Sequence, residues 1–157
     1  MNIGGIIHGD WKFSSEQCNS ENRTAPTIVW GRLTDDATCK TNHTKHGDTA
    51  PVKFRIRLKK HVFVRCTVKE DNPFYWVARR LKKGEPVMAF GLFSIWPYTT
   101  KDGTRKIGHD FYPQAMIAGL MATDPLAYTD LHGSGADPLF SQEDTDSARD
   151  VEYNPFD

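Results

Sequence analysis

Residues 52–59 read Val-Lys-Phe-Arg-Ile-Arg-Leu-Lys, and apolar and basic side chains alternate along the whole stretch. A repeat of two is that of a β-strand, so the pattern predicts a strand with an apolar face toward a core and a basic face opposite. Successive cations on the basic face lie about 7 Å apart, close to the phosphate spacing of a nucleic-acid backbone. The alternative is an ordinary solvated sheet face, but such faces also carry acidic residues and this one has none.

Four more strands are predicted from their β-branched and aromatic content and from the turn residues that separate them. They cover residues 27–33, 61–68, 87–96 and 105–112. The last two are joined by a hairpin whose tip is Lys101-Asp102-Gly103-Thr104.

A helix is predicted between the third and fourth strands in chain order. Asn72 can cap it, Pro73 suits its first position and Gly84 suits its end. The sequence thus predicts an all-β chain with one helix, in the element order of the OB-fold. This fold is a five-stranded barrel whose sheet face binds oligonucleotides in many proteins.

The formal net charge of zero hides two oppositely charged parts of the chain. Residues 23–107 hold 18 Lys and Arg against 7 Asp and Glu, whereas residues 108–157 hold one Arg against 10 Asp and Glu. A basic body favours a polyanionic ligand, and an acidic tail is typical of a solvated interaction segment. The tail can also compete with that ligand for the site on the body.

Three segments are expected along the chain. Residues 1–26 form an N-terminal extension, in which Gly4-Gly5-Ile6-Ile7 can add an edge strand. Residues 27–122 form one OB-fold domain, and residues 123–157 form a disordered acidic tail that is too polar to pack. The sequence has neither a secretory signal nor a run of about 18 apolar residues, so a cytoplasmic protein without a membrane span is expected.

Two other classes of function compete with nucleic-acid binding. Cys39, His43 and His46, with Cys18 and Cys66 elsewhere, are residue types that zinc prefers, but their spacing is not that of a zinc finger. An odd number of cysteines favours reduced thiols. No catalytic triad, carboxylate pair or phosphate loop stands out, so we expect a binding protein without catalytic residues, metal or cofactor. An RNA-binding or protein-interaction barrel is the alternative function.

Four stretches of the chain, taken in order, follow a known pattern. Residues 81–91 read Leu-Lys-Lys-Gly-Glu-Pro-Val-Met-Ala-Phe-Gly, and residues 98–103 read Tyr-Thr-Thr-Lys-Asp-Gly. Together they resemble the bacterial single-stranded DNA-binding protein family, in which a helix ends in Lys-Gly, a strand ends in Gly, and an aromatic residue precedes an acidic hairpin. Residues 29–36 resemble the opening strand of that family, and Asn154-Pro155-Phe156 resembles its acidic C-terminal tip.

This resemblance implies a function and partners. The function is sequence-independent binding and protection of single-stranded DNA in replication, recombination and repair. The tip would recruit replication and repair proteins, and the chain would form a homo-oligomer. A tetramer is implied by the family, and a dimer is the alternative because residues 1–26 are an extra leader. The location would be the bacterial cytoplasm or nucleoid, and a phage or plasmid origin is consistent with the short tail.

Site residues follow from the charge pattern and from the resemblance. Tyr98 stands where the family carries an aromatic residue on its hairpin, and Phe63 stands near a second family aromatic, so both are expected to stack on bases. Trp96 and Trp30 are further candidates, although large rings on strands are more often part of a core. The cations expected to contact phosphates are Arg32, Lys53, Arg55, Arg57, Arg65, Arg105 and Lys106. The residues expected to dock partner proteins are Tyr153, Pro155 and Phe156.

Overall fold

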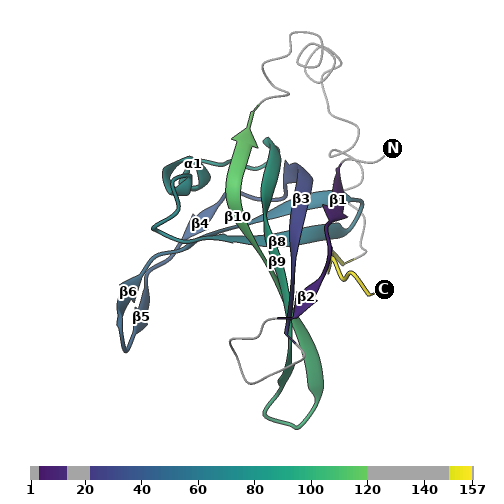
Figure 1. The fold of residues 1–157 in the computed structure, drawn as a ribbon. Helices are drawn as coiled ribbons and strands as arrows, with labels where there is room; N and C mark the ends of the chain where they lie inside the picture. Colours follow the sequence, from purple (N-terminus) through teal and green to yellow (C-terminus); the bar gives the residue numbers. More distant parts are fainter. Residues whose placement is uncertain (1–3, 14–21, 120–148, 157) are drawn as a thin grey trace.

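Five long strands close into a β-barrel (Figure 1). The structure, a computed structural model, describes residues 4–13, 22–119 and 149–156. The barrel strands are β3 (Arg23–Leu33), β7 (Val52–Lys59), β8 (Val62–Val68), β9 (Pro86–Thr99) and β10 (Arg105–Ala118).

Pairing runs around the barrel in the order β3, β9, β10, β8 and β7, and β7 pairs back to β3. All neighbours are antiparallel except β8 and β10, which are parallel. A short helix, α1 (Tyr75–Arg79), lies between the third and fourth barrel strands in chain order. This arrangement is OB-like, so the predicted all-β fold with one helix and a five-stranded barrel is confirmed.

The barrel core follows the alternation of the strands. Each of the four apolar residues of β7 is 5% exposed or less, as the repeat at residues 52–59 predicted. Phe93 of β9 and Phe111 of β10 are the largest fully buried side chains, and Leu33 of β3 is also fully buried. Complete burial of a side chain of this size stabilises the fold by about 1.5–3 kcal/mol.

The helix is shorter than the sequence predicted and begins three residues after Asn72. The Asn72 side chain accepts a hydrogen bond from the Phe74 amide (2.8 Å) and donates one to the Pro113 carbonyl (2.6 Å). It therefore fixes a turn against β10 and does not cap the helix. Ala78 and Leu81 are buried in the core, whereas Trp76 is 63% exposed.

Six short strands surround the barrel, and most extend it at an edge. β1 pairs with β3, so the N-terminal extension adds an edge strand, as the sequence indicated that it could. β2 also pairs with β3, β4 pairs with β7, and β11 pairs with β8. These strands are β1 (Gly5–His8), β2 (Lys12–Phe13), β4 (Thr38–Cys39), β5 (Asn42–Thr44), β6 (Gly47–Thr49) and β11 (Val151–Glu152).

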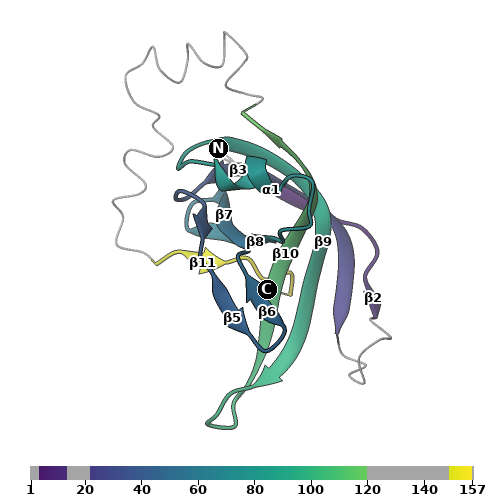
Figure 2. The same ribbon diagram turned by 90° about the vertical axis from the view of Figure 1, so that its left-hand side faces the viewer.

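Two hairpins project from the barrel on the same side (Figures 1 and 2). One is the β5–β6 hairpin, which forms a separate two-stranded sheet. The other is the long β9–β10 hairpin, which turns at Gly103 with a φ of 86°. A positive φ favours glycine at this turn. Within the described residues, no helix has both the length and the apolar content needed to cross a membrane.

Candidate nucleic-acid interface

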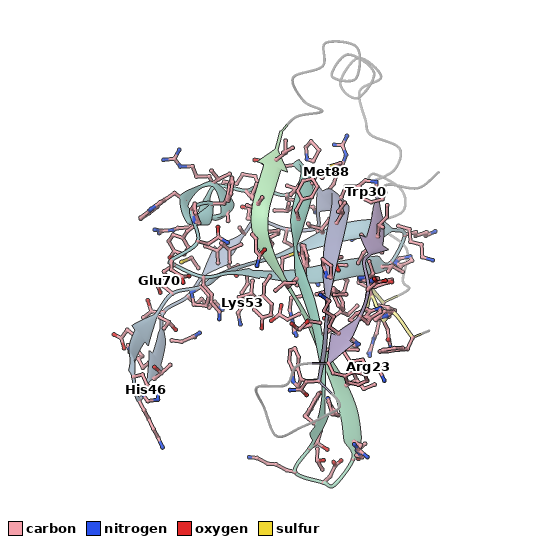
Figure 3. All side chains as sticks on the ribbon, in the orientation of Figure 1. Arg23, Trp30, His46, Lys53, Glu70 and Met88 are labelled. Atoms are coloured by element: carbon pink, nitrogen blue, oxygen red, sulfur yellow. The ribbon has the colours of Figure 1, made fainter. Side chains whose placement is uncertain are left out.

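Basic residues of β7 and β8 meet in register on the outer surface of the barrel. Lys53 is the partner of Thr67, Arg55 that of Arg65, and Arg57 that of Phe63. Cross-strand partners point to the same side of a sheet, so the cations predicted on separate strands form one surface. We call the outer surface formed by residues 53, 55, 57, 63, 65 and 67 the basic face. Figure 3 shows Lys53 at this surface.

Arg55 is held in place at the centre of the basic face. Its guanidinium forms an ion pair with Asp35 and lies 4.7 Å from the centroid of the Phe63 ring. The hydrogen bond from Arg55 lowers the pKa of Asp35. One face of the Phe63 ring is thus covered by a cation, and this contact helps to hold Arg55 in place.

Arg57 was predicted to lie exposed with its neighbours, but it is only 8% exposed. Its two terminal nitrogens donate to the two carboxylate oxygens of Asp150, at 3.3 and 3.2 Å. His61 Nδ1 lies 3.4 Å from the same carboxylate. The register of β7 shifts between Arg57 and Lys59, and the acidic segment covers the strand there. Arg57 therefore forms a paired, buried part of the basic face.

The segment that covers Arg57 is the last described part of the chain. β11 pairs in parallel with β8, and the Tyr153 amide donates to the Phe63 carbonyl at 2.7 Å. A Glu152 carboxylate oxygen lies 4.0 Å from an Arg65 nitrogen. The tail was expected to be disordered throughout, but residues 149–156 pack on the barrel. We call these residues the tip segment. Its acidic residues lie beside Arg57 and Arg65, two of the cations that the sequence predicted to contact phosphates.

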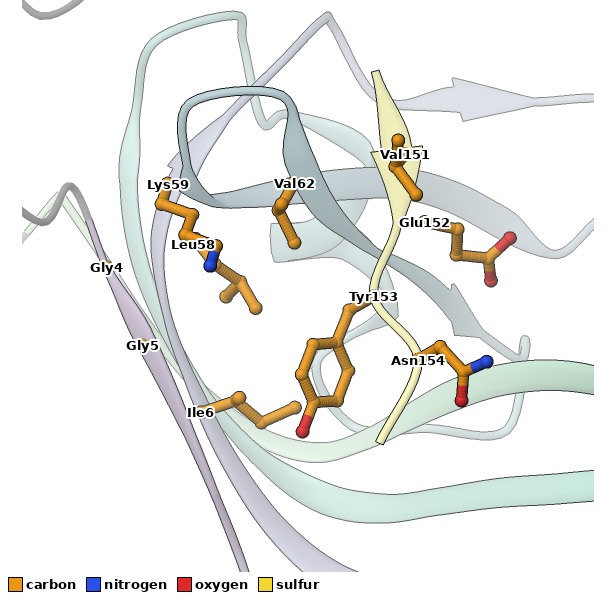
Figure 4. Close-up of a pocket in the computed structure, with 10 residues that line it drawn as sticks. All are labelled: Gly4, Gly5, Ile6, Leu58, Lys59, Val62, Val151, Glu152, Tyr153 and Asn154. Carbon is orange, nitrogen blue, oxygen red and sulfur yellow. The ribbon is translucent and has the colours of Figure 1, made fainter. Parts of the chain in front are cut away.

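Tyr153 anchors the tip segment in a cage of aromatic rings. It stacks on His8 and packs edge-on against Phe93, with centroid distances of 5.7 and 6.0 Å. A cavity of about 330 Å³ adjoins it, and Figure 4 shows the ring pointing toward Ile6. Phe156 lies further along, near Trp11 and Arg23. Of the residues predicted to dock partners, Tyr153 and Phe156 therefore contact the barrel of this chain.

The hydrogen bonds of the cage fix the tautomer of His8. Thr27 Oγ1 donates to the Ala25 carbonyl at 2.9 Å, so His8 Nδ1 must donate to Thr27 Oγ1 at 2.8 Å. His8 Nε2 is then the acceptor for the Tyr153 hydroxyl at 3.2 Å. Burial lowers the pKa of His8 from its usual 6.5. Neutral His8 therefore stabilises the fold above pH 6.5, and this contribution is lost as the pH falls through the folded-state pKa.

The β9–β10 hairpin carries the remaining stacking candidate with two of the predicted cations. Tyr98 is 43% exposed, and its cross-strand partner is Lys106. Arg105, the partner of Thr99, is also exposed. The hairpin thus brings together one exposed ring and two exposed cations that the sequence analysis named as separate candidates.

Trp96 and Trp30 both pack over glycines of neighbouring strands. A Cβ added to Gly108 would lie 2.5 Å from the Trp96 ring, and one added to Gly5 would lie 2.4 Å from the Trp30 ring. Both tryptophans are half-buried by this packing and lie outside the basic face. Arg32 donates to the Gly84 carbonyl at 3.2 Å and is the cross-strand partner of Arg57, so it lies on β3 at the edge of the basic face.

A second surface of the barrel is apolar and was not predicted. Ile7 of β1, Ile28 of β3 and Phe90 of β9 are cross-strand partners in one row, and Leu92 lies two positions from Phe90. Ile7 is 57% exposed, and Phe90 and Leu92 are each 37% exposed. We call this surface, together with Ile117, the apolar face. Its sequence signal was the nearly continuous apolar run at residues 87–96, which lacks the alternation of a strand with a solvated side.

The cysteines and histidines named as zinc candidates have other roles in the described residues. Cys39 is hydrogen-bonded to the Tyr75 hydroxyl, and His43 pairs with Asp48 at 2.8 Å. Cys66 is fully buried in the core, and burial raises its pKa. Cys18 lies outside the described residues. In residues 4–13, 22–119 and 149–156, no three His, Cys, Asp or Glu side chains gather as a metal site would require.

The chain matches no protein-family model and no curated protein sequence.

Proposed function

We propose that this chain binds single-stranded DNA, with little dependence on base sequence, along the basic face of its barrel. The observation that carries the proposal is the in-register pairing of cations across β7 and β8, with Arg55 fixed over Phe63. Tyr98 on the β9–β10 hairpin supplies an exposed ring at one end of this path. Proteins that hold single strands combine a basic groove for the phosphates with rings for the bases, each stack being worth about 1–3 kcal/mol. Protection of single-stranded DNA in replication, recombination and repair is the corresponding role.

Binding through phosphates predicts a steep dependence on salt. If about five phosphates are neutralised, the logarithm of the affinity for oligo-dT falls with the logarithm of salt concentration at a slope of about −3.5. Fluorescence anisotropy of a labelled oligo-dT at several salt concentrations measures this slope. A flat response would count against a phosphate-binding face.

The relative affinities for single-stranded DNA, RNA and duplex DNA distinguish the proposed function from an RNA-binding barrel. We expect oligo-dT to bind more tightly than duplex DNA, because stacking on Tyr98 needs unpaired bases. Titration with oligo-dT, oligo-rU and duplex DNA, followed by tryptophan fluorescence, distinguishes these ligands. Equal affinity for duplex DNA would contradict the proposal, and a preference for oligo-rU would favour an RNA-binding barrel.

The tip segment acts as an internal competitor in this proposal. Neutralising its acids with Asp150→Asn and Glu152→Gln is expected to tighten oligo-dT binding about threefold to tenfold, because both carboxylates lose their attraction for the basic face, and a partly exposed ion pair such as Glu152 with Arg65 contributes up to about 1 kcal/mol. Anisotropy at low salt measures the change. The control pair Asp144→Asn and Asp146→Asn removes the same charge outside the described residues. Equal tightening in both pairs would show a general charge effect in place of competition at the basic face.

Release of the tip segment would expose Tyr153 and Pro155 to other proteins and free Phe156, which is already 52% exposed, from its contacts with the barrel. Two aromatic rings around a proline, beside acidic residues, fit a pocket with a basic rim. The barrel itself provides such a setting, in which Arg23 lies over the Phe156 ring at 6.0 Å. We therefore include in the proposal that a DNA-bound chain presents its tip segment to replication or repair proteins.

The apolar face supports a homo-oligomer in the same proposal. Four of its side chains, on β1, β9 and β10, are between 37% and 57% exposed: Ile7, Phe90, Leu92 and Ile117. A contiguous exposed apolar surface on a barrel is typical of a protein interface. The partner that binds this apolar face is a second copy of the chain. The apolar face continues across the hydrogen-bonded strands β1, β3 and β9, and such a surface suits a self-complementary contact.

A further inference from the structure

Trp11 of the N-terminal extension is an aromatic residue that belongs neither to the basic face nor to the apolar face. It packs edge-on against Phe93 at a centroid distance of 6.1 Å, and its ring lies 5.0 Å from that of His8. These two contacts hold the indole against the barrel. The Phe156 ring lies 6.3 Å from Trp11 and is inclined to it by 32°. Trp11 therefore already has one aromatic ring of the tip segment beside it.

A cation lies beside the same Phe156 ring. The Arg23 guanidinium is 6.0 Å from the centroid of Phe156 and 4.8 Å from that of Phe13, its cross-strand partner on β2 (Figure 3). On the basic face, Arg55 lies over Phe63 at a similar distance. A guanidinium with a ring against its flat side keeps its N–H donors, which lie in its plane, for an anion. Arg23 is thus positioned in the same way as Arg55.

A cavity of about 340 Å³ adjoins Arg23 and Phe156. Its volume lies within the range of small-molecule sites. One cation beside apolar and aromatic walls suits a flat ring that carries a negative group. Phe156 is itself 52% exposed, so its ring borders an open site and is not part of the packed core. The other residues that line the cavity are Ile95, Trp96, Pro97 and Ile107.

The tip segment presents to the barrel the two kinds of group that a single strand carries, namely anions and flat rings. Its acidic residues lie beside cations of the basic face, and Phe156 lies beside Trp11 and Arg23. We propose that a nucleotide of the bound strand replaces Phe156 at this site, with its base stacked on Trp11 and its phosphate on Arg23. This inference rests on the proposed function and adds to it a stacking residue from the N-terminal extension.

The sign of one substitution separates stacking from a purely anchoring role of Trp11. If Trp11 only anchors the tip segment, Trp11→Ala releases a competitor and tightens the binding of oligo-dT. Loss of a base stack instead weakens binding, by about tenfold, and Trp11→Phe keeps most of the affinity. Fluorescence anisotropy measures the change in the chain that carries Asp150→Asn and Glu152→Gln, so that release of the tip segment does not mask it. Unchanged or tighter binding would overturn the inference, whereas a wild-type chain that does not bind oligo-dT would overturn the proposed function.

Photo-cross-linking tests the same contact in the unaltered chain. Oligo-dT with 5-iodouracil in place of one thymine reacts on irradiation with an aromatic ring that stacks on it, and mass spectrometry of the digest identifies the residue. We expect a cross-link at Trp11 that an excess of unlabelled oligo-dT suppresses. Trp76, which is 63% exposed on α1, is the internal control and should not react. Cross-links at other rings without one at Trp11 would overturn the inference.

The phosphate contact of Arg23 has a separate test. Arg23→Gln is expected to make the salt dependence of oligo-dT binding shallower by about 0.7, the contribution of one phosphate contact to a single strand. Arg80→Gln makes the same change in charge at an exposed position after α1 and is expected to leave the slope unchanged. Equal slopes for Arg23→Gln and the wild-type chain would overturn the assignment of a phosphate to Arg23.

Discussion

Reversing Arg55 and Arg65 to glutamate is expected to lower the affinity for oligo-dT more than a hundredfold. The two residues are cross-strand partners at the centre of the basic face, and Arg65 is exposed. Each hydrogen bond to a charged group contributes about 1.5–3 kcal/mol, so loss of both gives at least about 3 kcal/mol before repulsion by the new charges is added. Anisotropy with labelled oligo-dT at a fixed salt concentration measures the loss.

A matched pair of substitutions on the helix serves as the control for this experiment. Arg79→Glu and Arg80→Glu make the same change in charge at two exposed positions of α1 or its end, outside the basic face. They are expected to change affinity only through net charge, by much less than the first pair. Comparable losses in the two pairs would mean that affinity depends on overall charge and that the basic face has no special role. Melting temperatures of all variants show whether each remains folded.

Replacing Phe90 and Leu92 with aspartate is expected to dissociate the oligomer. Burying each of these side chains in an interface contributes about 1.5–3 kcal/mol, so the pair raises the dissociation constant at least a hundredfold, and buried charges add to that. Sedimentation equilibrium should show the wild-type chain at two or four times its mass of 17.8 kDa and the variant at the single-chain mass.

The helix again offers the control, because Trp76 and Val77 are 63% and 45% exposed there. Trp76→Asp with Val77→Asp removes at least as much exposed apolar surface without touching the apolar face, and the oligomer is expected to persist. A wild-type chain that sediments at the single-chain mass would contradict the proposed assembly. Dissociation by both pairs would place the interface elsewhere.

The sequence was most informative where the structure depends on neighbours along the chain. The repeat at residues 52–59 gave the strand and its buried side, because the alternation of side chains in a strand is a local property. The helix was predicted too long because Asn72, a good cap by type, uses its side chain to bond β10, 41 positions away. Nothing in residues 69–84 signals that contact.

The burial of Arg57 was beyond prediction for the same reason. It depends on Asp150, which lies 93 positions further along the chain. The composition of the tail predicted that it is too polar to pack. Composition is an average over the whole segment, however, and the single side chain of Tyr153 anchors the tip segment on the barrel. The packing of Trp30 and Trp96 did have a signal, since each faces a glycine on the adjacent strand. This pairing of a tryptophan with a glycine can be recognised in the sequence only once the strand register is known.

The aromatic cage also bears on the order of events during synthesis. His8 and Tyr153 are 145 positions apart, so their hydrogen bond forms only after synthesis has passed residue 153. All five barrel strands leave the ribosome before the tip segment does, because synthesis begins at the N-terminus. A newly folded barrel therefore passes through a period with Arg57 and Arg65 uncovered, next to the RNA of the machine that made it. Binding of the tip segment to the barrel ends that period.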